Sequence, residues 1–126
     1  MPAKSANTKQ TGDVAEAQAL AFLQAKGLTL VARNYRTPGR GGGEIDLILR
    51  DHDGTLVFVE VRHRTSQSHG GAAASVSANK QRRIVFAARH YLLRLSGALP
   101  PCRFDVMAME PTGVQWLQGA FDAQPR

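Results

Sequence analysis

Two stripes of apolar residues at helical spacing predict helices over residues 12–26 and 77–96. A polar residue suited to capping precedes each stripe, and a glycine suited to ending a helix follows it. These flanking residues are Thr11 and Gly27 for the first helix, and Ser77 and Gly97 for the second. The stripes consist of Ala15, Ala19, Leu20, Phe22 and Leu23, and of Ile84, Ala87, Ala88, Tyr91 and Leu95.

Runs rich in β-forming residues, several of them alternating between apolar and polar positions, predict five strands. The runs cover residues 28–36, 43–50, 55–64, 102–108 and 114–117. The element order is therefore helix, three strands, helix, two strands. Since no repeat or linker interrupts residues 11–126, we expect one domain there, preceded by a disordered basic tail over residues 1–10.

Acidic residues stand inside the two central strands, where apolar residues would be less costly to bury: Asp46 in the first and Glu60 in the second. A three-residue turn with Gly54 in the left-handed position would place these two acids directly opposite each other. A two-residue turn would put them on opposite faces. The face of the first strand away from Asp46 is expected to carry Ile45, Leu47 and Leu49.

Two carboxylates this close destabilise a sheet unless one is protonated, a cation binds, or a basic side chain neutralises them. Mg²⁺ suits such a pair, because it takes one or two acidic ligands and keeps several waters. An ion pair with Arg62, on the same face as Glu60, explains the acids without a metal, and the residue pattern alone favours this explanation. Glu44 shares the face of Asp46 and is a candidate supporting acid.

Three further charged residues, Glu16, Lys80 and Asp105, are candidates for the same site. Glu16 lies on the apolar stripe of the first helix, where it either reaches water at the edge or acts as a ligand. Lys80 is expected to point towards the sheet near the start of the second helix. Asp105, in the fourth strand, is either a third acid of the site or an ion-pair partner of Arg103, Arg62 or Lys80.

The charge balance favours a polyanionic partner, since the net charge is +6 and the pI is about 10.3. Nucleic acid, and DNA in particular, is the first candidate, although a basic surface can also serve solubility alone. The sequence leaves the oligomeric state open between a monomer and a homodimer. The arginines that we expect to contact phosphates are Arg36, Arg40, Arg64, Arg82 and Arg83.

Several functional classes are excluded by the sequence. One cysteine, Cys102, allows no disulfide within the chain and no zinc cluster built on thiolates, and it favours a cytoplasmic location. His69 has no second His or Cys at metal-ligand spacing. The glycine-rich loop over residues 37–43 lacks the ending of a P-loop, and no apolar run is long enough to span a membrane.

The central motifs resemble those of the YraN family of nuclease-like bacterial proteins. They are Gly43-Glu44-Ile45-Asp46 and Phe58-Val59-Glu60-Val61-Arg62, with further matches in residues 11–16, 70–76, 80–81 and 102–106. The resemblance implies a restriction-endonuclease-like fold, in which helices flank a central mixed β-sheet in three α/β layers. The implied element order, α-β-β-β-α-β-β, agrees with the order predicted from the residue pattern.

The resemblance also implies an active site. Asp46 and Glu60 match the metal-binding acids of that fold, and Glu16 occupies the position of a third acid on the first helix. Arg62 stands where a lysine is expected, and arginine stabilises charge but does not accept a proton. Lys80 is a candidate replacement for that lysine.

Three functional hypotheses follow. The first is a Mg²⁺- or Mn²⁺-dependent endonuclease acting on DNA, including branched or damaged structures, with Asp46, Glu60, Arg62 and Lys80 as catalytic residues. The second is a nucleic-acid-binding module that keeps the nuclease fold without its chemistry. The third, a scaffold for protein interactions, has no long apolar stripe to support it.

Overall fold

The computed structural model describes residues 4–64 and 76–123. Within these residues, two helices and five strands follow one another in the predicted order. The helices are α1 (Lys4–Ala25) and α3 (Ala78–Leu92). The strands are β1 (Thr29–Arg36), β2 (Glu44–Arg50), β3 (Leu56–His63), β4 (Cys102–Glu110) and β5 (Gly113–Phe121).

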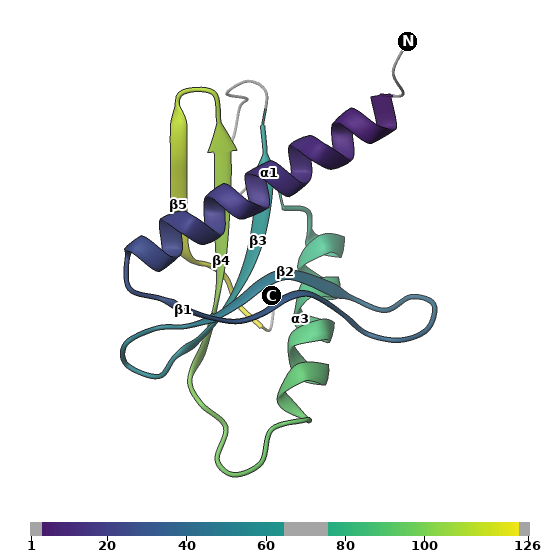
Figure 1. The fold of residues 1–126 in the computed structure, drawn as a ribbon. Coiled ribbons are helices and arrows are strands. Elements are labelled where there is room, and N and C mark those ends of the chain that lie inside the picture. The colour runs from purple at the N-terminus through teal and green to yellow at the C-terminus, as the bar shows by residue number, and fades with distance from the viewer. Residues whose placement is uncertain (1–3, 65–75, 124–126) are drawn as a thin grey trace.

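The strands form one mixed sheet in the order β1-β2-β3-β4-β5. Neighbouring strands run antiparallel except β3 and β4, which are parallel and are joined by a crossover that contains α3. Helix α1 crosses one face of the sheet and α3 lies against the other (Figure 1). This arrangement confirms the predicted α/β fold with three layers.

The two faces of the sheet bury separate apolar clusters. The α1-side cluster joins one stripe of α1 to the sheet, and the α3-side cluster does the same for α3. Buried members of the α1-side cluster are Ala15, Ala19, Leu23, Leu28, Leu47, Leu49, Val57, Val59, Met107 and Met109. Those of the α3-side cluster are Ile45, Ile48, Leu56, Phe58, Val76, Ile84, Val85, Ala87, Ala88, Phe104 and Val106.

The hairpin between β2 and β3 has the predicted three-residue turn. The Asp51 amide donates to the Thr55 carbonyl at 2.9 Å, and Gly54 adopts a left-handed φ of 88°. Leu47 pairs with Val59 in the register that places Asp46 opposite Glu60. The alternative two-residue turn, which would separate the acids, is therefore excluded.

Alternation in β2 breaks at Asp46, which the sequence pattern did not predict. Ile45 packs in the α3-side cluster, whereas Leu47 packs in the α1-side cluster, so the expectation that they share a face was wrong. The break coincides with Asn34 of β1, whose φ is +51°, between the pairs Arg33–Leu47 and Tyr35–Ile45. Asparagine adopts this left-handed conformation more easily than most residues, so it can turn the strand locally.

Both helices have different ends from those predicted. Helix α1 begins at Lys4 rather than at residue 12, so Thr11 lies inside the helix instead of capping it. Residues 4–11 contain neither Gly nor Pro, and nothing in them breaks a helix. Ser77 caps α3 as predicted and accepts a hydrogen bond from the Lys80 amide at 3.1 Å, but the helix ends at Leu92, before Gly97.

The predicted loop that contains His69 falls within residues 65–75, outside the described residues. In the part of the chain that is described, no helix is long and apolar enough to cross a membrane.

Candidate functional site

The candidate site is built around the carboxyl groups of Asp46 and Glu60, on the two central strands. Asp46 Oδ2 accepts a hydrogen bond of 2.8 Å from the backbone amide of Val61, which ties the β2 side chain to β3. Glu60 stands two residues after Phe58 and shares its α3-side face. Only 3% of Glu60 is exposed. The hairpin register therefore places a buried acid, Glu60, beside a partly buried one, Asp46.

Two cationic side chains reach Glu60 from different elements. Lys80 Nζ, in the first turn of α3, lies 3.6 Å from Glu60 Oε2, and Arg62 Nη1 lies 3.8 Å from the same oxygen. Both separations exceed the usual length of a charge-assisted hydrogen bond. The two cations thus offset the negative charge on one side of Glu60 without filling its hydrogen-bonding capacity.

The second oxygen of this carboxyl group, Glu60 Oε1, is buried and accepts no hydrogen bond from a basic, amide or hydroxyl group among the described residues. A buried polar atom without a partner costs about 1–3 kcal/mol, so it usually marks a place where water, a ligand or a metal completes the site. This oxygen lies next to a second carboxyl group, that of Asp46. Carboxylate oxygens are the ligands that divalent cations such as Mg²⁺ prefer.

The carboxyl group of Glu60 donates a hydrogen bond to that of Asp46, so the two acids perturb each other. Burial, followed by the neighbouring charge of Asp46, raises the pKa of Glu60 to about 8, against the opposing effects of Lys80 and Arg62. Burial also raises the pKa of Asp46, and the hydrogen bond from Val61 partly counters this. Glu60 is therefore mostly protonated at pH 7, which avoids two adjacent negative charges.

Glu16, the predicted third acid, is held by contacts with β1. Its Oε1 accepts hydrogen bonds of 3.2 Å from both Arg33 and Asn34. No group of three His, Cys, Asp or Glu side chains within the described ranges is close enough to hold a metal ion. The structure thus brings Asp46 and Glu60 together, while direct participation of Glu16 stays a prediction.

Asp105 contacts Arg103, one of the partners that the sequence left open. Both of its oxygens accept from Arg103 Nε, at 3.1 and 3.2 Å, and it also accepts from Trp116 Nε1 at 2.9 Å and the Gly119 amide at 3.0 Å. Its side chain is completely buried. These contacts fasten β4 to β5, and none of them involves Asp46 or Glu60.

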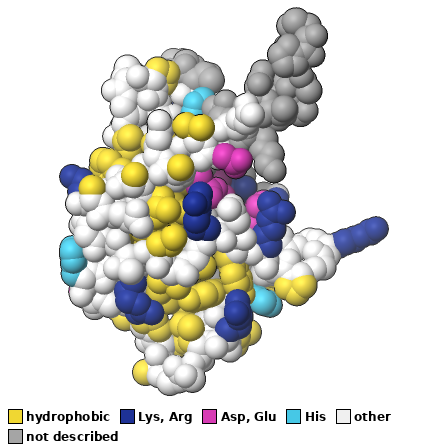
Figure 2. Space-filling view, in the orientation of Figure 1, with side chains coloured by type: hydrophobic (Ala, Val, Ile, Leu, Met, Phe, Trp, Pro, Cys, Tyr) yellow, Lys and Arg dark blue, Asp and Glu magenta, His cyan; other side chains and the backbone are white. Residues whose placement is uncertain are grey.

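The five arginines expected to contact phosphates have different environments. Arg64 is buried, and its Nε lies 3.7 Å from Glu110 Oε2. The other four arginines, Arg36, Arg40, Arg82 and Arg83, are exposed. Figure 2 shows acidic side chains gathered in one area of the visible face with Lys or Arg beside them, while other basic side chains are scattered. The described surface is thus basic at separate points on this face.

Two elements of the site escape sequence reasoning. The Val61 amide that binds Asp46 is a backbone group, so no residue type signals it. Asn34, which both turns β1 and binds Glu16, gives a weak signal, because asparagine within a predicted strand is uncommon.

The fold and the site define a class: three-layer α/β proteins that carry a carboxyl pair, one member buried and one partly buried, on two central strands. A model of the uncharacterised protein family UPF0102 matches residues 15–109. The chain belongs to this family, which is the YraN family indicated by its motifs, so the resemblance seen in the sequence is confirmed. The matched range includes Glu16, Asp46, Glu60 and Lys80.

Relatives in several bacteria match most of the chain. A UPF0102 protein of Paracidovorax citrulli (strain AAC00-1) is 67% identical over 121 residues, which span 96% of this chain and 89% of the relative. A UPF0102 protein of Albidiferax ferrireducens is 67% identical over 116 residues, spanning 92% and 90%. The UPF0102 protein Mpe_A3766 of Methylibium petroleiphilum is 62% identical over 119 residues, spanning 92% and 97%.

Proposed function

We propose that this protein is a Mg²⁺- or Mn²⁺-dependent endonuclease that cleaves DNA, with branched or damaged DNA as the expected substrates. One observation carries the proposal: beside the carboxyl group of Asp46, Glu60 buries an oxygen that no basic, amide or hydroxyl group satisfies. A purely structural ion pair with Arg62 would satisfy more of the hydrogen-bonding capacity of Glu60, because a guanidinium group can donate to both oxygens of a carboxylate.

Asp46 and Glu60 would hold the metal, and Glu16 would assist directly or through water. A bound Mg²⁺ or Mn²⁺ supplies acidified water and offsets the negative charge of a phosphodiester. The site is also suited to release a proton, since Glu60 is mostly protonated at neutral pH without a cation. Metal binding requires carboxylates, so it would displace this proton.

Lys80 and Arg62 would stabilise the negative charge that develops on the phosphate during cleavage. Both stand at the same oxygen of Glu60, so each is positioned at the acid pair from a separate element, α3 or β3. Lys80 enters from the capped first turn of α3 and can supply the point charge that the resemblance assigns to the missing lysine.

Cleavage of radiolabelled junction, flap and linear DNA in Mn²⁺ tests the proposal. We expect Asp46→Asn and Glu60→Gln to lower the cleavage rate at least about 100-fold, the usual scale for removing an electrostatic contribution to catalysis. Asp53→Asn is the matched control, because it removes the same charge from the exposed turn of the same hairpin. An Asp46→Asn variant that cleaves at the rate of the unchanged protein would rule out this site.

The contact between Arg62 and Glu60 favours a second candidate, a nucleic-acid-binding module without catalysis, because the arginine already offsets part of the acidic charge. This candidate predicts binding that weakens as salt rises, no cleavage in any metal, and tighter binding after the acids are neutralised. The endonuclease instead requires cleavage that depends on the acids.

A further inference from the structure

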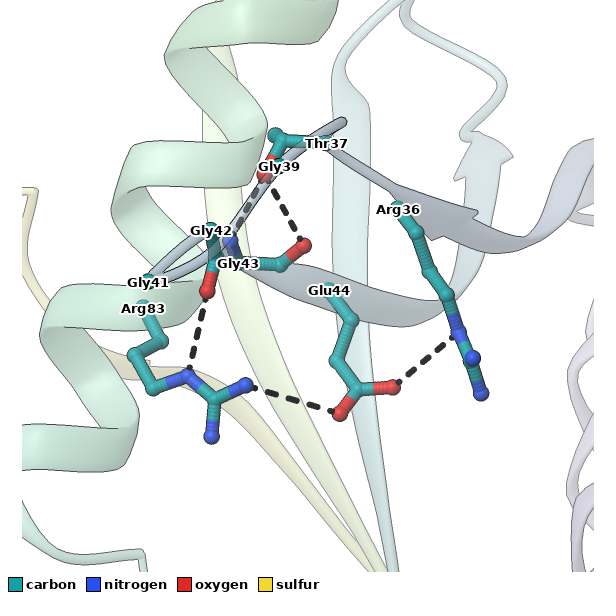
Figure 3. Close-up of a pocket in the computed structure, with 8 residues that line it drawn as sticks. All are labelled: Arg36, Thr37, Gly39, Gly41, Gly42, Gly43, Glu44 and Arg83. Carbon is teal, nitrogen blue, oxygen red and sulfur yellow. Dashed lines mark hydrogen bonds and ion pairs between the residues drawn. The ribbon is translucent and has the colours of Figure 1, made fainter.

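A polar pocket lies where the β1–β2 loop meets α3, and its volume is about 260 Å³. Figure 3 shows its lining, in which two arginine side chains approach the glutamate at the start of β2 from opposite sides. The lining consists of Arg36, Thr37, Gly39, Gly41, Gly42, Gly43, Glu44 and Arg83.

The loop that forms the pocket is fixed at both ends. The Gly43 amide donates to the Thr37 hydroxyl at 2.8 Å, and the Thr37 amide donates to the Gly43 carbonyl at 3.0 Å. Arg83 Nε donates to the Gly42 carbonyl at 3.3 Å, which ties the loop to α3. A Cβ atom on Gly43 would lie only 1.9 Å from the Arg83 carbonyl oxygen, so only glycine allows this approach.

The two arginines face a single carboxylate. Arg36 Nε lies 3.6 Å from Glu44 Oε2, and Arg83 Nη2 lies 3.9 Å from Glu44 Oε1. Both separations are long for charge-assisted hydrogen bonds, and the arginine side chains are 73% and 47% exposed. Exposed pairs of this kind contribute little to stability, so an anion with better geometry can displace the carboxylate.

The pocket and the acid pair share the elements β2 and α3. Glu44 precedes Asp46 by two residues in β2, and its charge contributes to raising the pKa of Asp46. Arg83 follows Lys80 by three residues in α3, a spacing that places side chains on neighbouring positions of one helix face. A nucleic-acid backbone passing the acid pair would therefore place an adjacent phosphate near this pocket.

We propose that the pocket binds a backbone phosphate of nucleic acid, and that Glu44 is an internal anion that holds Arg36 and Arg83 in place until the phosphate displaces it. The phosphate chemistry follows from the two guanidinium groups, which match the oxygens of a phosphate, and from glycines that permit close backbone approach. Assigning the phosphate to nucleic acid rests on the proposed function. Cation chemistry at Asp46 and Glu60 is not required.

Nuclear magnetic resonance titration of ¹⁵N-labelled protein with inorganic pyrophosphate, in EDTA, tests the pocket without nucleic acid or cleavage. We expect shifts at the amides of Gly41 and Gly43 and at the side-chain Nε signals of Arg36 and Arg83. Glu44→Gln should bind pyrophosphate about threefold to tenfold more tightly, because it removes a competing exposed ion pair. Absence of shifts at these four positions would overturn the inference, whatever the protein does to DNA.

Matched variants separate the pocket from general charge effects. Asp122→Asn removes one exposed negative charge just beyond β5, at the opposite edge of the sheet from β1, and should leave pyrophosphate affinity unchanged. If it tightens binding as much as Glu44→Gln, the role of Glu44 is wrong. Arg36→Ala should weaken binding about tenfold, whereas Arg50→Ala, at the far end of β2, should not. Arg36 does not bond the loop, so its variant avoids the disturbance that Arg83→Ala can cause.

Titration of oligonucleotides in EDTA identifies the source of the phosphate. We expect Arg36→Ala and Arg83→Ala to weaken DNA binding and to lower the salt dependence by about one phosphate contact each. Pyrophosphate binding together with unchanged DNA binding in both variants would overturn the assignment to nucleic acid. Pocket-dependent DNA binding without cleavage in Mn²⁺ would support the pocket and overturn the proposed endonuclease.

Discussion

At the scale of single residues, Glu60 concentrates the unusual features of the molecule. It is an acid on the interior face of a central strand. One of its oxygens is buried without a basic, amide or hydroxyl donor, and two cations stand at the other oxygen. A glutamine or leucine there would avoid the cost of burying charge. This cost is consistent with a ligand that completes the site.

The raised pKa of Glu60 makes stability depend on pH. In the unfolded chain this carboxyl loses its proton near its ordinary value of 4.5, whereas in the folded protein it keeps the proton up to about pH 8. The unfolded state therefore binds fewer protons between these values, and rising pH lowers the free energy of unfolding by at most about 1.4 kcal/mol per pH unit. Urea unfolding in EDTA at several pH values measures this loss.

Glu60→Gln is the control for that prediction, since the amide does not titrate. The difference in the free energy of unfolding between the unchanged protein and this variant should change steadily between about pH 4.5 and 8 and level off above about pH 8. A difference that stays constant over this range would contradict the raised pKa.

Asp105 shows how one buried residue can support the sheet instead of the site. It accepts four hydrogen bonds, from Arg103, Trp116 and Gly119, on the face of β4 that belongs with the α1-side cluster. We expect Asp105→Ala to lower the free energy of unfolding by about 3–5 kcal/mol, because it leaves a partly buried arginine with less compensation. Chemical denaturation measures this, with the exposed Asp122→Asn as a control whose midpoint should not move.

At the scale of elements, the hairpin shows what the sequence could and could not predict. The turn over residues 52–54 contains Gly54 at the position that needs a left-handed residue, so the register of β2 and β3 could be predicted from local chemistry. The break at Asp46 coincides with the left-handed Asn34 in the neighbouring strand β1, and a pattern read along β2 alone contains no signal for it.

The approach of Gly43 to α3 predicts a clear effect on stability. A Cβ atom at this position would overlap the Arg83 backbone, so Gly43→Ala should lower the free energy of unfolding by about 1–3 kcal/mol or more. Gly12→Ala is a matched control, because that glycine lies in α1 with no neighbouring atom within 4 Å, and alanine there should stabilise the helix by about 0.5–1 kcal/mol. Equal effects of the two changes in thermal unfolding would contradict the close packing of this loop.

At the scale of the whole molecule, the helix-sheet-helix arrangement follows from the order and amphipathic pattern of the elements, so the sequence predicted it well. The composition of the site was harder to predict, because it depends on how the helices cross the sheet. Lys80 reaches Glu60 as expected, whereas Glu16 binds Arg33 and Asn34. Helical periodicity places a residue on a face, but it does not choose its partner.

The central claim is that Asp46 and Glu60 together hold a divalent cation. Calorimetric titration with Mn²⁺ at pH 7, in two buffers of different ionisation enthalpy, tests it most directly. We predict one bound Mn²⁺ per chain, release of about one proton because Glu60 is mostly protonated beforehand, and loss of binding in Asp46→Asn but not in Asp53→Asn. The claim would be contradicted if the unchanged protein did not bind Mn²⁺, or if Asp46→Asn still bound it.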